Sequence, residues 1–172
     1  DLKFEKTRIA LDARGGDNAP ECVVGGADIG RASHRHIEMV FFGNKARIEP
    51  LLQRSRYLGD ATIIHTDDAV SPDDTASQAV RRGKMTSMWL AIASVAAGEA
   101  DAVVSAGNTG ALKGMSKLQF RTMPGVTRPA IAAFFPNKAV PNPRAKPATF
   151  HKGNMIVGFT FSLTINSSNF DL

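Results

Sequence analysis

Apolar residues along the chain fall into short continuous runs, separated by longer stretches in which they recur every three or four positions. Continuous runs bounded by turn residues are typical of buried strands, and the longer period is typical of helices. The runs predict five strands, over Arg8–Ala13, Ile37–Gly43, Ala61–Thr66, Ala100–Gly107 and Ala130–Pro136. Because these strands lack a polar face and alternate with helices, we expect an α/β fold with a doubly wound, mostly parallel sheet that has helices on both faces.

Start and stop signals locate the helices between the strands. Asp17 or Asn18 is placed to cap the first helix, with Pro20 in its first turn and Cys22 as a small core residue on it. Further helices are predicted over residues 45–56, 76–84, 87–98 and 108–122.

The pattern changes after Pro136. A basic stretch with several prolines has neither a helix nor a strand period, and residues 155–168 then offer one isolated β-like run. We therefore predict two regions: an α/β region over residues 1–136, and a divergent tail over residues 137–172 for which no fixed fold is expected.

Composition and charge narrow the function classes. The net charge of the 172 residues is +5, but residues 1–136 carry 17 Lys and Arg against 15 Asp and Glu, and residues 137–172 carry 4 against 1, so the excess lies mainly in the tail. No aromatic residues are interleaved among the basic ones, which disfavours nucleic-acid binding.

The single cysteine excludes an internal disulfide and suits a reducing cytosol, and no run reaches the ~20 apolar residues of a membrane span. We expect a cytoplasmic protein.

Two glycine-containing loops each follow a predicted strand and precede a predicted helix. They read RGGDNAP over residues 14–20 and SAGNTG over residues 105–110. In a parallel sheet, ligands bind beyond the carboxyl ends of the strands, where glycines let the backbone approach a ligand and helix N–H groups attract anions. Either loop alone is also typical of an ordinary strand-to-helix turn, but the two together favour a phosphate site. Neither matches the dinucleotide or P-loop pattern.

The candidate binding residues all lie in these loops or at the strand ends beside them. They are Asp12, Gly15, Gly16, Asp17, Ser105, Gly107, Asn108, Thr109 and Gly110. For Asp17 we favour a capping role. No metal site is predicted, because His34, His36, His65 and His151 lack the spacing of ligands.

Four longer segments carry a resemblance to a known family. IALDARGGDNAPE, ASQAVRRGKMTSMWLAI, GEADAVVSAGNTGAL and RTMPGVTRPAIAA occur in this order between Arg8 and Phe135. Together they closely resemble the bacterial phosphate acyltransferases of phospholipid synthesis, also called fatty acid/phospholipid synthesis proteins. The resemblance implies transfer of a fatty acyl group from acyl-[acyl-carrier-protein] to orthophosphate, which gives acyl phosphate and the free carrier thiol.

The resemblance also implies a fold similar to that of the isocitrate and isopropylmalate dehydrogenases, and a cytoplasmic homodimer able to sit at the membrane surface. In this reaction backbone N–H groups of Gly15, Gly16, Gly107 and Thr109 would hold phosphate. The catalytic candidates are the three cations Arg81, Arg82 and Lys84, which would neutralise the developing oxyanion, and Asn108. The segment that holds the three cations is equally compatible with a solvated helix end. The chemistry demands neither a metal nor a cofactor.

The chain departs from the family in two places. Arg14 stands where such proteins usually carry methionine, and nothing after Asn137 matches the Asp-x-Gly-Ala-Asn motif that follows in the much longer family members. We therefore expect a truncated chain that holds the N-terminal half of the family's site. Two alternatives stay open: a non-catalytic fragment, and a related phosphotransacetylase-like enzyme that uses acyl-CoA.

Overall fold

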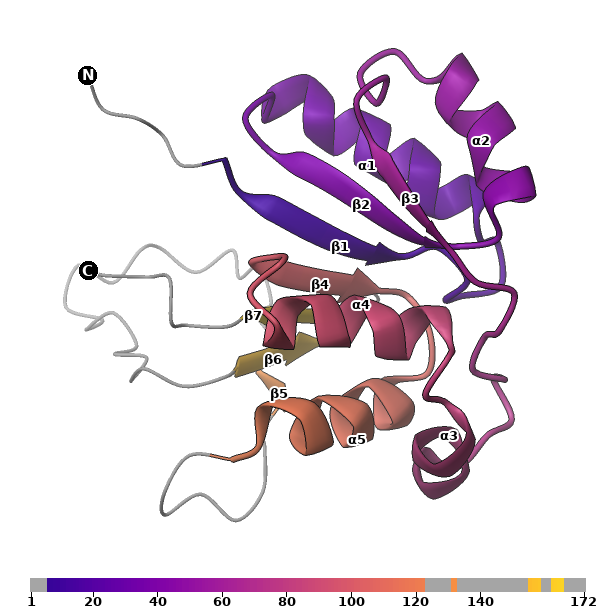
Figure 1. Ribbon diagram of the computed structural model, residues 1–172, viewed down its shortest axis with the longest axis vertical. Helices are drawn as coiled ribbons and strands as arrows, with labels where there is room; N and C mark the ends of the chain where they lie inside the picture. Colours follow the sequence, from indigo (N-terminus) through magenta and orange to yellow (C-terminus); the bar gives the residue numbers. More distant parts are fainter. Residues whose placement is uncertain (1–5, 123–130, 133–154, 159–161, 166–172) are drawn as a thin grey trace, which may run out of the picture.

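The computed structural model describes residues 6–122, 131–132, 155–158 and 162–165, and alternates strands and helices along the first of these ranges (Figure 1). The strands are β1 (Arg8–Asp12), β2 (Glu38–Gly43), β3 (Thr62–His65), β4 (Ala102–Ser105), β5 (Ile131–Ala132), β6 (Met155–Gly158) and β7 (Ser162–Ile165). The helices are α1 (Glu21–Ser33), α2 (Lys45–Arg54), α3 (Ala76–Arg82), α4 (Ser87–Ala96) and α5 (Thr109–Phe120). All strands and helices predicted between residues 8 and 122 are present.

The strands form one sheet in the order β3-β2-β1-β4-β7-β6-β5. β1 pairs in parallel with β2 on one side and with β4 on the other, and β2 pairs in parallel with β3. β7 runs antiparallel to both β4 and β6, while β5 is parallel to β6. The predicted doubly wound, mostly parallel α/β sheet is confirmed.

Two short strands lie in the segment for which the sequence pattern indicated a single β-like run. β6 and β7 pair antiparallel, with Val157 opposite Leu163 and Gly158 opposite Ser162. Within the described residues, β5 covers only Ile131–Ala132 of the predicted fifth strand. The rest of that strand and the predicted region boundary at residue 136 lie outside the described residues.

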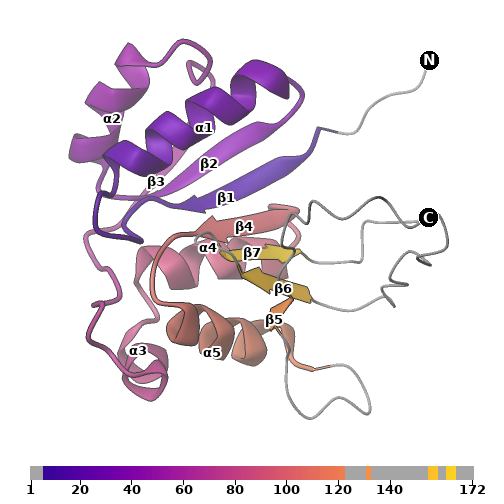
Figure 2. The same cartoon turned by 180° about the vertical axis from the view of Figure 1, so that it is seen from behind.

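Helices cover the two faces of the sheet, and a separate apolar core fills the space under each group (Figures 1 and 2). Leu11 and Phe41 face α1 and α2, together with Val24 and Ile48 from those helices. Their strand neighbours Ala10 and Phe42 face α4 and α5 instead, as expected when successive side chains alternate between faces. Strands buried on both faces explain why the sequence showed continuous apolar runs.

One part of the sheet departs from the expected two-sided cover. α4 packs against β1, β2 and β4, and no helix among the described residues covers the same face of β3. Ile64 on β3 is therefore 41% exposed, and a groove of about 760 Å³ lies along this face, with Val40, Phe42 and Leu90 in its wall. The connection through α3 leads to α4 over the centre of the sheet, so that β3 remains an edge strand.

The described helices contain none that is both long and apolar enough to cross a lipid bilayer.

Candidate functional site

The winding of the sheet changes direction between β1 and β4. From β1 the chain proceeds through α1 to β2 and through α2 to β3, and then returns to the other side of β1 to form β4. The loops that leave the carboxyl ends of β1 and β4 therefore lead to helices associated with opposite faces, and a crevice opens between them. We call residues 13–20 loop 1 and residues 106–108 loop 2.

Loop 1 turns sharply before α1 begins. Gly16 has φ +94°, a conformation that favours glycine, and the N–H of Ala19 donates to the Gly16 carbonyl at 3.3 Å. α1 starts only at Glu21, with Pro20 as its N-cap residue and no side-chain cap. The prediction that Asp17 or Asn18 caps this helix is wrong, because α1 begins only at Glu21 and Pro20 occupies the N-cap position. The prediction that Cys22 is a core residue is also wrong, since Cys22 is exposed.

Loop 2 leads directly into α5. The Oδ1 atom of Asn108 accepts from the N–H of Ala111 at 3.0 Å, which makes Asn108 the N-cap residue. Its Nδ2 group donates to the carbonyl of Asp74 at 2.9 Å and to that of Pro72 at 3.4 Å. Both ends of the Asn108 amide are thus engaged in holding loop 2 and the segment before α3, which leaves the side chain little freedom for chemistry.

Asp12 lies beneath the two loops. Its carboxylate accepts hydrogen bonds from Ser87 Oγ at 2.6 Å, from Ser105 Oγ at 2.7 Å and from the N–H of Arg14 at 3.2 Å. Asp12 is 1% exposed and Ser105 2% exposed, so the structure places these two predicted binding residues under the site rather than in its wall. Burial raises the pKa of Asp12, and the hydrogen bonds that favour the ionised carboxylate only partly oppose this effect.

Ser87 was missed by the sequence reasoning. It is the first residue of α4, and its hydroxyl connects that helix to the end of β1. A serine at a helix start normally indicates a capping role, whereas here Thr86 is the cap and accepts from the N–H of Trp89. The pairing with Asp12, across 75 residues of sequence, leaves no local signal.

Gly15 and Gly107 allow the two loops to approach each other closely. A Cβ atom on Gly15 would lie 2.5 Å from Asp12 Oδ2, 2.8 Å from Ser105 Oγ and 2.9 Å from the nitrogen of Gly107. A Cβ atom on Gly107 would lie 3.0 Å from the terminal methyl of Met88 and 3.2 Å from the Cα of Gly15. Neighbouring protein atoms therefore take the Cβ positions of both glycines, and Gly107 still lines the pocket on its open side.

Two of the four proposed backbone donors are also occupied. The N–H of Gly15 donates to the Asp12 carbonyl at 3.4 Å, and the N–H of Gly107 donates to Ser105 Oγ at 3.1 Å. Gly16 remains as a donor in loop 1. Thr109 and Gly110 are the first two residues of α5, and the Asn108 side chain accepts from the N–H of the next residue, Ala111. Backbone N–H groups in the first turn of a helix have no carbonyl partner within that helix.

A pocket of about 720 Å³ opens above these contacts. Loop 1, loop 2 with the start of α5, and the segment after β3 each form one wall of it. The lining residues are Arg14, Gly16, Asp17, Ala69, Val70, Ser71, Pro72, Ala106, Gly107, Asn108, Thr109 and Gly110. The sequence had placed two loops here but not the third wall, although Ser71 and Pro72 also follow a strand and so belong to the same edge of the sheet.

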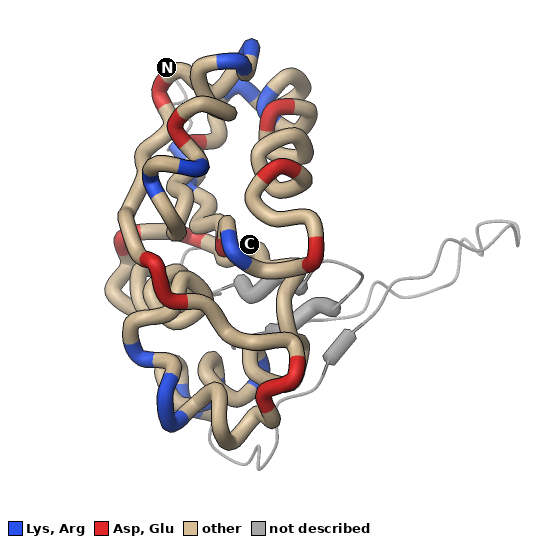
Figure 3. The backbone as a smooth tube through the Cα atoms, turned by 90° about the vertical axis from the view of Figure 1, so that its right-hand side faces the viewer, with Lys and Arg blue, Asp and Glu red and all other residues tan. Residues whose placement is uncertain are grey.

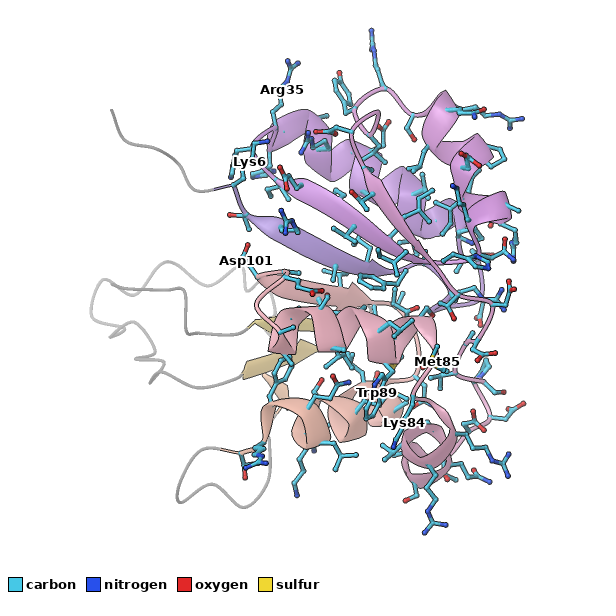
Figure 4. The ribbon with its side chains drawn as sticks, viewed as in Figure 1. Lys6, Arg35, Lys84, Met85, Trp89 and Asp101 are labelled. Atoms are coloured by element: carbon cyan, nitrogen blue, oxygen red, sulfur yellow. The ribbon has the colours of Figure 1, made fainter. Side chains whose placement is uncertain are left out.

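The three candidate cations lie apart from this pocket. Arg81, Arg82 and Lys84 are all exposed near the end of α3, and Figure 4 shows Lys84 in the turn between α3 and α4, close to Met85. Arg82 lines a smaller hollow of about 240 Å³ that shares Ala69 and Val70 with the main pocket. The structure does not bring Arg81 or Lys84 into either wall.

The charge around this edge of the sheet is mixed. Figure 3 looks onto the side at which β1 to β4 end and shows acidic and basic segments interspersed. Within the main pocket Arg14 is the single cation and Asp17 the single acid among the described lining residues. Recognition at this site therefore depends on individual groups rather than on a field of one sign.

Comparisons with known proteins cover most of the chain. A family model described as "Fatty acid synthesis protein" matches residues 7–142. A relative named "Phosphate acyltransferase" from Parvibaculum lavamentivorans is 55% identical over 130 residues, which are 74% of this chain and 36% of the relative. One of the same name from Bradyrhizobium diazoefficiens is 54% identical over 137 residues, 78% of this chain and 39% of the relative. The chain thus spans less than half the length of these curated relatives.

Proposed function

The chain belongs to the family of fatty acid synthesis proteins, and from this membership we propose that it forms the phosphate-binding part of an acyltransferase. The proposed enzyme transfers a fatty acyl group from acyl-[acyl-carrier-protein] to orthophosphate and supplies acyl phosphate for phospholipid synthesis. The name of the relatives, phosphate acyltransferase, supports an acyl donor and phosphate as the substrates. The carrier-bound donor and the use of the product are our proposals.

The observation that carries the proposal is the meeting of loop 1 and loop 2 in one pocket at the point where the sheet changes its winding direction. Ligands of doubly wound folds bind at this point. Gly16, Thr109 and Gly110 line the pocket, and we propose that their N–H groups donate to phosphate oxygens. Its volume of about 720 Å³ exceeds what orthophosphate occupies and leaves space for the thioester carbonyl.

In the proposed reaction an ionised oxygen of orthophosphate attacks the carbonyl carbon of the thioester. A carbon–oxygen bond forms, the carbon–sulfur bond breaks, and the thiolate leaves with the bonding electron pair and takes a proton from water. Orthophosphate already carries ionised oxygens at neutral pH, and thiolate is a good leaving group, so positioning contributes most of the catalysis. Among the three candidate cations, Arg82 has the position from which it can approach the oxyanion, since its hollow adjoins the pocket.

The test is phosphate-dependent release of carrier thiol from a long-chain acyl thioester. Because the chain spans 36% of the Parvibaculum relative, we expect no measurable acyl phosphate from the chain alone. We expect turnover from a chimera in which the remaining sequence of that relative follows residue 135. A phosphate-free reaction subtracts simple hydrolysis.

Two results would contradict the proposal. A chimera that prefers acyl-CoA over the carrier thioester would favour the phosphotransacetylase-like alternative. A chimera that binds phosphate but transfers no acyl group from either donor would favour a non-catalytic phosphate-binding protein.

We also propose a cytoplasmic homodimer that can associate with membranes, as implied by the family. Sedimentation at micromolar concentration tests the dimer, and a monomer at that concentration would contradict it.

A further inference from the structure

Arg14 is held in loop 1 with its side chain at the pocket. Its backbone N–H donates to Asp12 Oδ1 at 3.2 Å. A Cβ atom on Gly43 would lie 3.2 Å from the Cγ atom of Arg14. The aliphatic stem of Arg14 therefore passes over the end of β2. Arg14 is half-buried and lines the pocket. The backbone and the stem are thus fixed by the ends of two strands, which limits the positions that the guanidinium can take.

The guanidinium of Arg14 has no carboxylate partner among the described residues. Arg8, Arg31 and Arg47 each form an ion pair with an acid, whereas Arg14 forms none. Asp17 lines the same pocket, three positions later, but the two side chains make no ion pair. A partly desolvated guanidinium without a counter-ion favours an anion, and its planar fork suits two oxygens of a phosphate.

Asp17 adds a second constraint on any anion in the pocket. A carboxylate repels a fully ionised oxyanion, but it accepts a hydrogen bond from one that still carries a proton. At neutral pH orthophosphate retains at least one proton and sulfate retains none. A repulsive group of this kind separates two ligands of nearly equal size and shape.

We propose that Arg14 and Asp17 act as a pair that makes this pocket selective for protonated orthophosphate over sulfate. Arg14 supplies a positive charge that attracts both anions in this chain, and Asp17 penalises the anion that has no proton to donate. The inference rests on the proposed function, because it assigns the specificity of the proposed phosphate site. It concerns binding alone and includes no bond-forming step.

The experiment measures the binding of inorganic phosphate and of sulfate to the 172-residue chain by titration calorimetry at pH 7 and constant ionic strength. The native chain should bind phosphate about tenfold more tightly than sulfate. Arg14→Met should weaken the binding of both anions by about tenfold or more. Arg14→Lys should recover part of this loss, because it restores the charge without the planar fork.

Asp17→Asn tests the second half of the pair. It should increase the affinity for sulfate and bring the two dissociation constants to within about threefold of each other. Arg54→Met and Glu49→Gln are the matched controls, since both residues are exposed on α2 and line no wall of the pocket. Both controls should leave the two affinities unchanged. Circular dichroism establishes that each variant is folded.

The possible failures are distinguishable. A native chain that binds neither anion would count against the phosphate site itself and with it the proposed function. Phosphate binding that Arg14→Met leaves unchanged, or that Arg54→Met weakens equally, would overturn the role of Arg14 alone. An unchanged ratio of phosphate to sulfate affinity in Asp17→Asn would overturn the role of Asp17.

Discussion

The two loops that form the pocket look alike in sequence but are built differently. Loop 2 enters its helix at once, and the Asn108 side chain is fully used by the α5 cap and by the carbonyls of Pro72 and Asp74. Loop 1 turns at Gly16 and reaches α1 without a side-chain cap, so Arg14 and Asp17 keep their charged groups at the pocket. The Asn108 side chain in one wall is committed to structure, whereas the charged side chains of the other wall are free to contact a ligand.

The difference shows that a polar residue in a glycine-rich loop is informative only once its hydrogen bonds are known. Asn108 and Asp17 were both candidate binding residues on sequence grounds, with Asp17 favoured as a helix cap and Asn108 also a candidate catalytic group. The structure separates them, because the first supports the fold and the second does not. Variants that affect stability should therefore concentrate in loop 2 and at the contact between the loops.

The largest effect is expected where the two loops touch. Gly15→Ala places a Cβ 2.5 Å from Asp12 Oδ2 and 2.9 Å from the nitrogen of Gly107, so the loops must separate and the free energy of unfolding should fall by about 3 kcal/mol or more. Urea denaturation measures it. Gly110→Ala is the matched control, because its Cβ would lie 3.3 Å from Asn108 Oδ1 and 3.6 Å from the Cβ of Ala76. Its effect should stay within about 1 kcal/mol. Equal losses in the two variants would refute the assigned contact.

The next effect compares the two polar side chains directly. Asn108→Ala removes the α5 cap and the bonds to two carbonyls, and should lower the free energy of unfolding by about 2 kcal/mol. Asp17→Ala should change it by less than about 0.5 kcal/mol, since Asp17 is exposed and caps no helix. If Asp17→Ala proves as costly as Asn108→Ala, loop 1 is held by its side chains after all.

A pH-dependent effect should come from Asp12 beneath both loops. Burial raises its pKa above the ordinary value of 3.8, so the folded chain holds the proton more tightly than the unfolded chain does. The stability from this group is complete below the ordinary value and is lost as the pH rises through the folded-state pKa. The free energy of unfolding of the native chain minus that of Asp12→Asn should fall, by at most about 1.4 kcal/mol per pH unit in that window. Denaturation of both proteins at a series of pH values measures this difference, and a difference that does not vary with pH would contradict the raised pKa.

The smallest effect concerns the outer support of loop 1. Arg47 on α2 donates to the Ala19 carbonyl at 3.2 Å and pairs with Glu21 at 3.4 Å, and both side chains are more than half exposed. Arg47→Gln should therefore lower the free energy of unfolding by less than about 0.5 kcal/mol, and 1 M salt should mask most of that change. Thermal denaturation at low and high salt measures it. A loss above 1 kcal/mol would mean that loop 1 depends on this surface contact.

Local patterns were sufficient to predict the elements of the fold. The apolar runs around Leu11 and Val103 mark strands because both of their faces are buried, and Asn108 marks the start of α5 because a cap acts within three residues. The edge of the sheet that holds the site followed from the same pattern, since every parallel strand ends there. The same reasoning could have predicted the third wall, because Ser71 and Pro72 also follow a parallel strand, but this wall was not predicted.

What the sequence did not show depends on contacts between distant segments. The use of Gly15 and Gly107 requires the two loops to meet across 92 residues, and the pairing of Ser87 with Asp12 spans 75. Asp17 satisfied the local rule for a cap, yet the backbone makes a left-handed turn at Gly16 and α1 begins only at Glu21. Local rules identify which residues are available, and the tertiary contacts decide which of them are used.

The cluster of Asp12, Ser87 and Ser105 has a consequence for how sequences of this fold can diverge. The three side chains come from β1, α4 and β4 and are nearly inaccessible to water. Loss of the carboxylate would leave two buried hydroxyls without their acceptor, and loss of either hydroxyl would remove a bond from a buried charge. Single replacements therefore pass through less stable intermediates, whereas a concerted change to three apolar residues of similar volume avoids them. The effects of substitutions at the three positions should therefore depend on one another, so that related sequences either keep all three residues or replace all three.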